Sequence, residues 1–295
     1  MADLALDVHP TRSSRWIEGI RRGGARLWLG AALVGLLVLV ALLAPLLAPH
    51  DPIEQDLMSA QLPPAWFSGG DPAYWLGTDS LGRCVLSRLI YSARTAVAVA
   101  LIAASLAAAI GIAFGLIAGS FGGWVDQATS RLIDVWMAFP PVLLSIVLAA
   151  VIGAGLTSVI AAIVVVDWTR FARVVRAETM VQLQRDYAAA ARAIGLSRGR
   201  ILRLEILPNL VPLLVTLLAV EMGIAILVEV ILSFVGISVA GDTPTWGGMI
   251  AEGRQIVYQA PWIMALPIGC IILSLIGFNL LGDGLRKTLD PVQRR

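Results

Sequence analysis

Residues Arg170–Ile206 read RFARVVRAETMVQLQRDYAAAARAIGLSRGRILRLEI and separate two long apolar stretches of a 295-residue chain. This polar segment holds eight of the chain's 22 lysine and arginine residues. An arginine-rich, helix-forming segment between apolar stretches is suited to face water and to contact a partner. The eight arginines are Arg170, Arg173, Arg176, Arg185, Arg192, Arg198, Arg200 and Arg203.

The composition predicts a membrane protein. Hydrophobic residues make up 58% of the chain and charged residues 14%, and the mean hydropathy is positive. Soluble domains have about 45–50% apolar and about 25% charged residues. The formal charge of +2 says little about partners, and we expect no nucleic-acid partner.

The cysteines and histidines predict neither a disulfide nor a metal site. Cys84 lies in a predicted loop and Cys270 in an apolar stretch, and neither has a ligand-like neighbour. His9 and His50 are isolated in the sequence. We therefore expect this chain to bind no metal and no cofactor.

Several apolar stretches are long enough to cross a membrane, which takes about 20 residues. We interpret the first as a retained anchor, because it is too long for the apolar part of a signal peptide. The fifth span carries two acids, Glu221 and Glu229. The clear spans are Leu27–Ala48, Thr95–Gly123, Leu207–Val235 and one within Gln255–Gly282.

The stretch Val135–Val166 contains 32 uncharged residues. A single helix of that length would measure about 48 Å, too long for one crossing. Gly153-Ala154-Gly155 offers a turn in the middle, because glycine adopts turn conformations at low cost. We therefore predict two spans here and six in total.

The distribution of cations supports six spans with both termini cytoplasmic. This topology places 18 lysine and arginine residues in the cytoplasm and 4 outside, whereas one span in Val135–Val166 would place 7 inside and 15 outside. The predicted parts are a tail (1–26), a first span (27–48), an external loop (49–94), a five-helix core (95–285) with a cytoplasmic loop (177–207) and an external loop (236–260), and a tail (286–295).

The polar segment predicts two short helices that meet at a glycine. Apolar residues recur at helical spacing over Glu178–Ile194, which indicates an amphipathic helix. Gly195 is suited to end this helix, and Ser197 to cap the next one. Ala188–Ala191 would leave a shallow surface for a partner. The alternative is a solvated loop that only sets the topology.

The segment YAAAARAIG, followed eleven residues later by Leu-Pro, resembles the cytoplasmic EAA loop of bacterial ABC importer permeases. Ala189 stands where that motif has glutamate. The resemblance implies a coupling helix that sits in a cleft of an ATP-hydrolysing subunit. Ala190, Ala191, Gly195, Leu207 and Pro208 match the motif, and the implied coupling surface consists of Ala188, Ala189, Ala190, Ala191, Arg192, Gly195, Leu196, Ser197, Leu207 and Pro208.

Three further segments resemble the dipeptide/oligopeptide/nickel branch of these permeases. They are WLGTDSLGRCVLSRLIYSART (75–95), TPTWGGMIAEGR (243–254) and the C-terminal APW…FNLLGDGLRKTLDP (260–291). Cys84 stands where the branch usually has aspartate. The segment LPPAWFSGG (62–70) is most similar to dipeptide permeases.

This resemblance implies an all-α polytopic membrane protein: a type I importer (MetI-like) permease core with one extra N-terminal helix. The implied partners are a second, homologous permease, two ATP-binding subunits, a periplasmic binding protein and the lipid of the bacterial inner membrane. Dipeptides or short peptides are the favoured substrates, and glutathione-like peptides, nickel and other metal chelates remain alternatives.

The chain carries no phosphate-binding loop of the Gly-Lys-Ser/Thr type. Its one lysine, Lys287, is not preceded by the glycine-rich turn of that motif. ATP and magnesium would therefore be used by partner subunits, and this chain would be non-catalytic. Glu221 and Glu229 are predicted to line the substrate pathway, although either could instead be protonated or bonded to a neighbouring helix. An ion-coupled secondary transporter that uses these two acids is the alternative class, and a membrane hydrolase lacks its motifs.

Overall fold

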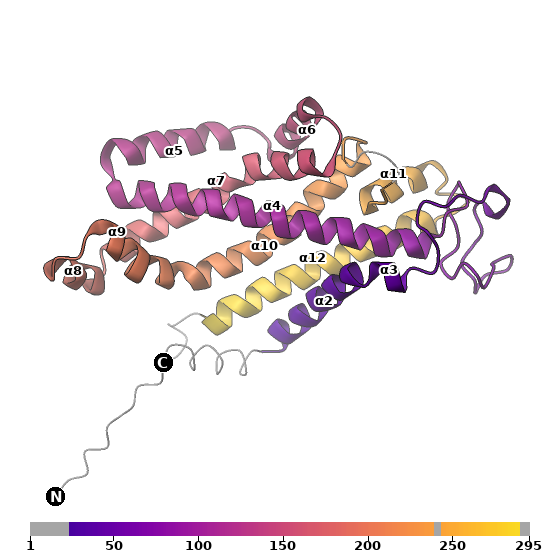
Figure 1. Ribbon diagram of the computed structural model, residues 1–295, viewed down its shortest axis with the longest axis horizontal. Coiled ribbons are helices and arrows are strands. Elements are labelled where there is room, and N and C mark those ends of the chain that lie inside the picture. The colour runs from indigo at the N-terminus through magenta and orange to yellow at the C-terminus, as the bar shows by residue number, and fades with distance from the viewer. Residues whose placement is uncertain (1–23, 239–242, 290–295) are drawn as a thin grey trace, which may run out of the picture.

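The computed structural model describes residues 24–238 and 243–289. Within these residues the chain is helical and forms no strand beyond an isolated bridge between Thr78 and Cys84. Long helices lie side by side, with α8 at one end of the bundle and α11 at the other (Figure 1). We call these the α8 end and the α11 end. Most of the predicted tails, 1–26 and 286–295, falls outside the described residues.

The first predicted span is helical but interrupted. α2 (Ala25–Leu42) is followed by the short α3 (Ala44–Leu47). The interruption comes at Leu43 because Pro45 has no N–H to continue the α2 hydrogen-bond ladder. An irregular segment containing the 3₁₀ helix η1 (Leu57–Ser59) leads on to the next helix.

The second span, α4 (Val85–Phe121), begins ten residues before its predicted start at Thr95. The last residues of the predicted external loop 49–94 are therefore helical, and their position outside the membrane stays a prediction. Arg88 among them is 3% exposed and forms buried ion pairs at the α11 end. A charged residue with buried partners can lie in a helix that its charge alone argues against.

The predicted turn at Gly153–Gly155 is confirmed. α6 (Pro141–Ile152) ends there and α7 (Leu156–Leu183) begins, with φ of +105° at Gly153 and +154° at Gly155. Before α6 lies α5 (Gly123–Met137), and the two helices meet at an angle of 86° across Pro140 and Pro141. This angle was not apparent from the sequence.

α4 and α7 pack closely through glycines. A Cβ at Gly111 would lie 2.4 Å from the carbonyl oxygen of Trp168, and one at Gly115 would lie 2.7 Å from Val175 Cβ. Such distances allow only glycine. The small residues of the second predicted span thus allow close packing of helices, as expected.

The remaining helices complete the bundle. After α7 come α8 (Asp186–Ala193), α9 (Arg198–Ile201) and the π-helical turn η2 (Leu202–Ile206), which runs directly into α10 (Leu207–Phe234). α11 (Trp246–Gln255) and α12 (Trp262–Leu289) follow. α12 lies against α2, where a Cβ at Gly30 would lie 2.3 Å from the backbone nitrogen of Leu281.

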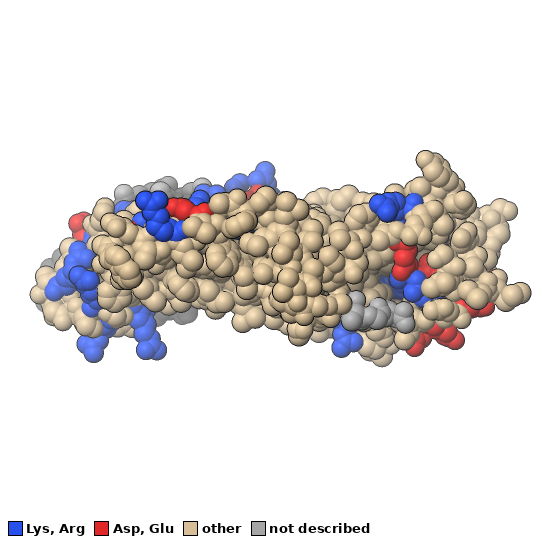
Figure 2. Space-filling view, turned by 90° about the horizontal axis from the view of Figure 1, so that it is seen from above, with Lys and Arg blue, Asp and Glu red and all other residues tan. Residues whose placement is uncertain are grey.

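Within the described residues, four helical segments are long and apolar enough to cross a membrane. They are α2, α4, the run Arg198–Phe234 and α12, and the bent pair α5–α6 would make a fifth. α7 does not qualify because Asp167, Arg170 and Arg173 lie near its middle. The total of six spans therefore stays a prediction. On the face shown in Figure 2, an uncharged band separates the charged residues near the two ends.

Candidate functional site

The polar segment turns sharply at Gly195, between α8 and α9. Its backbone has a φ of +83°, a left-handed conformation that favours glycine. The N–H of Gly195 donates to the carbonyl of Arg192 (3.0 Å), and the N–H of Leu196 donates to that of Ala191 (3.1 Å). This pair of bonds forms a Schellman motif, which satisfies carbonyls at a helix end. The predicted junction of two short helices at a glycine is confirmed.

The prediction of one amphipathic helix over Glu178–Ile194 is wrong. α7 ends at Leu183, and α8 begins at Asp186 after a two-residue break. Leu183 before the break and Tyr187 after it pack on the same apolar cluster, so the helical spacing of these residues continues across the break. Periodicity alone therefore concealed the bend.

The alanines of α8 divide between two faces. Ala188 and Ala191 are buried in an apolar cluster formed with α7, α9, η2 and the start of α10. Ala189 and Ala190 are exposed, and Ile194 beside them is 78% exposed. Successive helical residues point about 100° apart, so four in a row cannot share one face. Only half of the predicted patch therefore offers a surface to a partner, and the other half holds α8 to the bundle.

Side chains fix α8 against the end of α7. Tyr187 Oη donates to Gln182 Oε1 (2.5 Å), and Gln182 Nε2 donates to Glu178 Oε1 (2.7 Å). Arg192 Nη1 donates to the carbonyl of Leu183 (3.1 Å). Burial raises the pKa of the Tyr187 hydroxyl, so this group remains a hydrogen-bond donor at neutral pH. α8 is thereby held in a fixed orientation at the tip of the bundle.

The remaining predicted residues of the segment lie on either side of α9. Ser197 occupies the position before its first residue, as predicted, but its side chain makes no capping hydrogen bond. Pro208 is the second residue of α10 and directly follows the π-helical turn η2. Leu207 continues the helix from η2 without a break.

The eight arginines of the polar segment fall into two groups. Three, on α7, form ion pairs, and the other five are exposed at the α8 end, where basic side chains gather in Figure 2. The contacts are Arg170 Nη1–Glu221 Oε2 (3.5 Å), Arg173 Nη2–Asp134 Oδ1 (3.1 Å) and Arg176 Nη2–Asp126 Oδ2 (2.8 Å), and the exposed residues are Arg185, Arg192, Arg198, Arg200 and Arg203.

The two acids predicted to line a pathway, Glu221 and Glu229, are both only 1% exposed in this chain. Glu221 lies at the middle of α10 and pairs with Arg170 at the middle of α7. The same guanidinium lies 3.8 Å from Asp167. Glu229 accepts a hydrogen bond from the hydroxyl of Ser233 (2.5 Å). The contact of Glu221 fits the alternative of an acid bonded to a neighbouring helix, whereas Glu229 bonds within its own helix, and the pathway role of both stays a prediction.

At the α11 end, two of the sequence motifs meet through charges that the sequence analysis missed. Arg83 contacts Asp79 (2.8 Å) and Glu252 on α11 (2.9 Å). Arg88 contacts Glu252 (2.6 Å) and also pairs with Asp79. Asp79 and both arginines are at most 5% exposed. The available signal was that segments 75–95 and 243–254 each place acids and arginines beside apolar residues.

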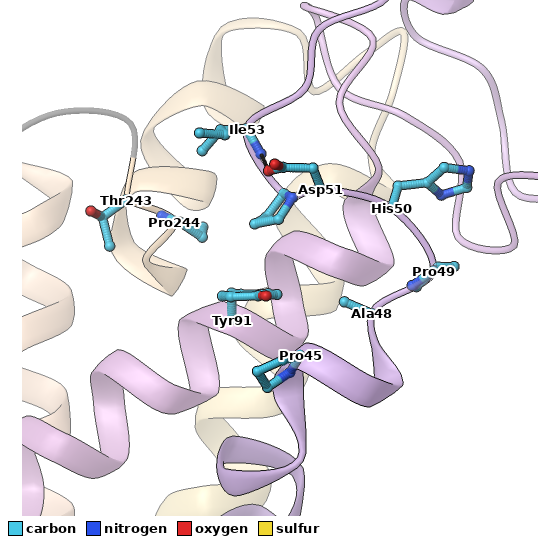
Figure 3. Close-up of a pocket in the computed structure, with 10 residues that line it drawn as sticks. Pro45, Ala48, Pro49, His50, Asp51, Ile53, Tyr91, Thr243 and Pro244 are labelled. Atoms are coloured by element: carbon cyan, nitrogen blue, oxygen red, sulfur yellow. Dashed lines mark hydrogen bonds between the residues drawn. The ribbon is translucent and has the colours of Figure 1, made fainter.

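An open cavity of about 790 Å³ lies at the same end (Figure 3). Its walls come from the end of α3, from Tyr91 on α4 and from Pro244 ahead of α11. Asp51 at its edge accepts a hydrogen bond from the N–H of Ile53 (3.0 Å). The ring of His50 points away from the cavity and stacks on Tyr74, with ring centroids 4.8 Å apart. Four prolines and the ring of Tyr91 thus contribute to this surface.

Known proteins are similar to this chain in both fold and sequence. Residues 111–295 match the family described as binding-protein-dependent transport system inner membrane component, and residues 27–64 match the N-terminal transmembrane domain of oligopeptide transport permease C. The dipeptide transport system permease protein DppC of Haemophilus influenzae is 40% identical over 99% of both chains. The glutathione transport system permease protein GsiD of Pectobacterium atrosepticum is 36% identical, over 87% of this chain and 83% of its own.

A solved structure supports the same fold. A chain of the MetNI methionine ABC transporter, in an inward-facing conformation, matches with a TM-score of 0.57 and 18% identity. The match covers 70% of this chain and 97% of that chain. The helical bundle and its projecting loop therefore define a MetI-like permease subunit of an ABC transporter. The chain belongs to the family of binding-protein-dependent transport system inner membrane components, and it is embedded in a membrane.

Proposed function

We propose that the chain is one permease subunit of an ATP-driven importer that takes up dipeptides or short peptides. The observation that carries this proposal is the α8–Gly195–α9 projection in a chain that is 40% identical to a dipeptide permease over its full length. The GsiD relative keeps glutathione-like peptides as the alternative substrate. Nickel and other metal chelates remain a further alternative.

In this proposal the α8 end docks on ATP-binding subunits. The exposed surface of Ala189, Ala190 and Ile194 would enter a cleft of one subunit, and exposed arginines would surround it. Ala189 offers no carboxylate, so the contact would be steric more than ionic. ATP and magnesium would be used by two such subunits, and this chain would perform no catalysis. Closure of the ATPases would then move α8 together with α7 and α10.

A second, homologous permease would complete the substrate pathway between the two chains. Both termini of this chain would be cytoplasmic, in the inner membrane of a bacterium. This orientation places the five exposed arginines of the polar segment in the cytoplasm, as the positive-inside rule favours. The α11 end would then face the periplasm.

A periplasmic binding protein would deliver the peptide to the α11 end. Large aromatic side chains there are exposed and available to a partner: Trp66 is 64% exposed, Trp75 67% and Tyr258 97%. The proline-lined cavity beside Tyr91 would form part of the same surface. The ion pairs of Arg83 and Arg88 would hold this surface in shape, because they tie the loop to α11.

Uptake by the reconstituted complex of permeases, ATPases and binding protein tests this proposal. Labelled dipeptide should accumulate in an ATP-dependent manner, and unlabelled dipeptide should compete better than glutathione or a nickel chelate. Stronger competition by glutathione or the chelate would reassign the substrate. Uptake without the ATPases, driven by an ion gradient, would support the secondary-transporter alternative and refute the proposal.

A further inference from the structure

An apolar cavity of about 330 Å³ lies between α2, α4 and α12, in the half of the bundle nearer the α11 end. α2 contributes Leu36, α4 contributes Ala93 and α12 contributes Leu273. Leu36 is 59% exposed and Leu273 is 56% exposed, so the cavity opens sideways. α2, α4 and α12 are among the segments that can cross a membrane, and the opening therefore faces the bilayer.

α2 and α12 approach each other closely at two glycines before they reach the cavity. Near the α8 end the two helices touch closely: a Cβ at Gly284 would lie 2.5 Å from the Cα of Leu27. Further along, a Cβ at Gly277 would lie 3.0 Å from the Cβ of Leu33. Beyond this point Leu266, Cys270, Leu273 and Ser274 of α12 line the cavity.

Two polar side chains in the cavity wall donate their hydrogen bonds to backbone carbonyls. Ser274 Oγ donates to the carbonyl of Cys270 (2.8 Å), and Trp246 Nε1 donates to the carbonyl of Leu89 (3.2 Å). The Cys270 thiol is a weak donor only. A bound water needs two to four polar partners, which this wall does not offer. The cavity therefore suits an apolar occupant.

The cavity is too small to hold a helix within it. A helix with side chains is about 10 Å across, so 330 Å³ would hold only about 4 Å of its length, less than one turn. The segments 1–23 and 290–295 of this chain are poor candidates, since they carry charged residues such as Arg12, Arg15, Glu18 and Asp290. A slender apolar chain remains, and the surrounding bilayer supplies one.

We propose that this cavity binds one acyl chain of a membrane phospholipid. The chain inserts between α2 and the α4–α12 pair and fills the cavity. Leu76 closes the cavity at the α11 end, and the neighbouring Trp75 is 67% exposed. Exposed tryptophans favour the level of the lipid headgroups. The phospholipid belongs to the leaflet at the α11 end, and it holds the N-terminal helix α2 at a fixed distance from the core.

Photolabelling of the unmutated complex in lipid nanodiscs tests this site. A phospholipid with a diazirine in its acyl chain should label peptides from residues 33–40 of α2 and 266–274 of α12 above all others. Labelling spread evenly over exposed apolar helices such as α6 would overturn the proposal. A protein cross-link from Cys270 to a helix of another subunit would do the same.

A substitution that fills the cavity with a larger side chain provides the second test. Ala93 is 2% exposed and lines the cavity, whereas Ala109 on the same helix is exposed away from it. In native mass spectrometry of the complex, Ala93→Phe should lose a phospholipid adduct that the unmutated protein and Ala109→Phe both retain. Equal retention by the two variants would refute the site. If Ala93→Phe does not assemble, the photolabelling result decides alone.

Discussion

Replacing Gly195 by alanine should weaken ATPase binding through backbone strain alone. Nothing lies within 4 Å of a Cβ built at this position, so the methyl group meets no neighbour. The φ of +83° is the whole obstacle, because a left-handed backbone costs a residue with a Cβ about 1–2 kcal/mol. That cost lowers the ratio of molecules with the native α8–α9 turn to molecules without it by a factor of about 5–30.

Gly199→Ala is the matched control for this change. Gly199 lies in α9, also with nothing within 4 Å, but in ordinary helical conformation. Alanine there should be neutral or stabilise the helix by up to about 1 kcal/mol. The two variants therefore add the same methyl group four residues apart and differ only in the backbone that receives it.

Co-purification of the ATP-binding subunits with tagged permease measures the effect. We expect Gly195→Ala to retain less ATPase and to lower peptide-stimulated ATP hydrolysis, with both permeases still present in the membrane. Gly199→Ala should match the unmutated protein. Equal ATPase retention by both variants would refute the coupling role of the α8–α9 turn.

Three further outcomes are expected. Ala188→Leu should destabilise the α8 end by about 1–3 kcal/mol through overpacking. Ala190→Leu on the exposed face should leave thermal stability unchanged and reduce ATPase co-purification. Equal melting temperatures for the two variants would contradict the division of the α8 alanines between a buried and an exposed face. Asp79→Asn should destabilise the α11 end by about 3–5 kcal/mol, because it leaves buried arginines short of a partner, and Asp71→Asn in the exposed loop should not; hydrogen exchange in α11 would distinguish them. Glu221→Gln should lower the melting temperature of the complex because it weakens the contact with Arg170, and a loss of uptake at unchanged stability would instead favour the pathway role.

The family and the helical class were predictable from the sequence because they rest on local patterns. Apolar length identified the four clear membrane helices, and Gly153–Gly155 and Gly195 marked turns that the structure confirms. Both glycine sites have positive φ, a property that belongs to the residue itself. The coupling role of this segment came from its resemblance to the EAA loop, and it stays a prediction.

The details that failed depend on contacts between distant segments. The second span was predicted from Thr95, whereas α4 begins at Val85, and Arg88 in its first turn finds its partner Glu252 164 residues away. The bend between α7 and α8 was missed because the helical periodicity continues across it. Sequence spacing cannot show which partner a charged side chain finds.

The sequence by itself determined that this chain forms membrane helices around an arginine-rich loop with a glycine turn, because hydropathy and backbone preference are properties of short segments. Only the tertiary structure decided that Ala188 and Ala191 face the bundle while Ala189 and Ala190 face outward. Only the tertiary structure paired Glu221 with Arg170. Orientation about a helix axis is set by the neighbouring helices, and those neighbours come together only when the chain has folded.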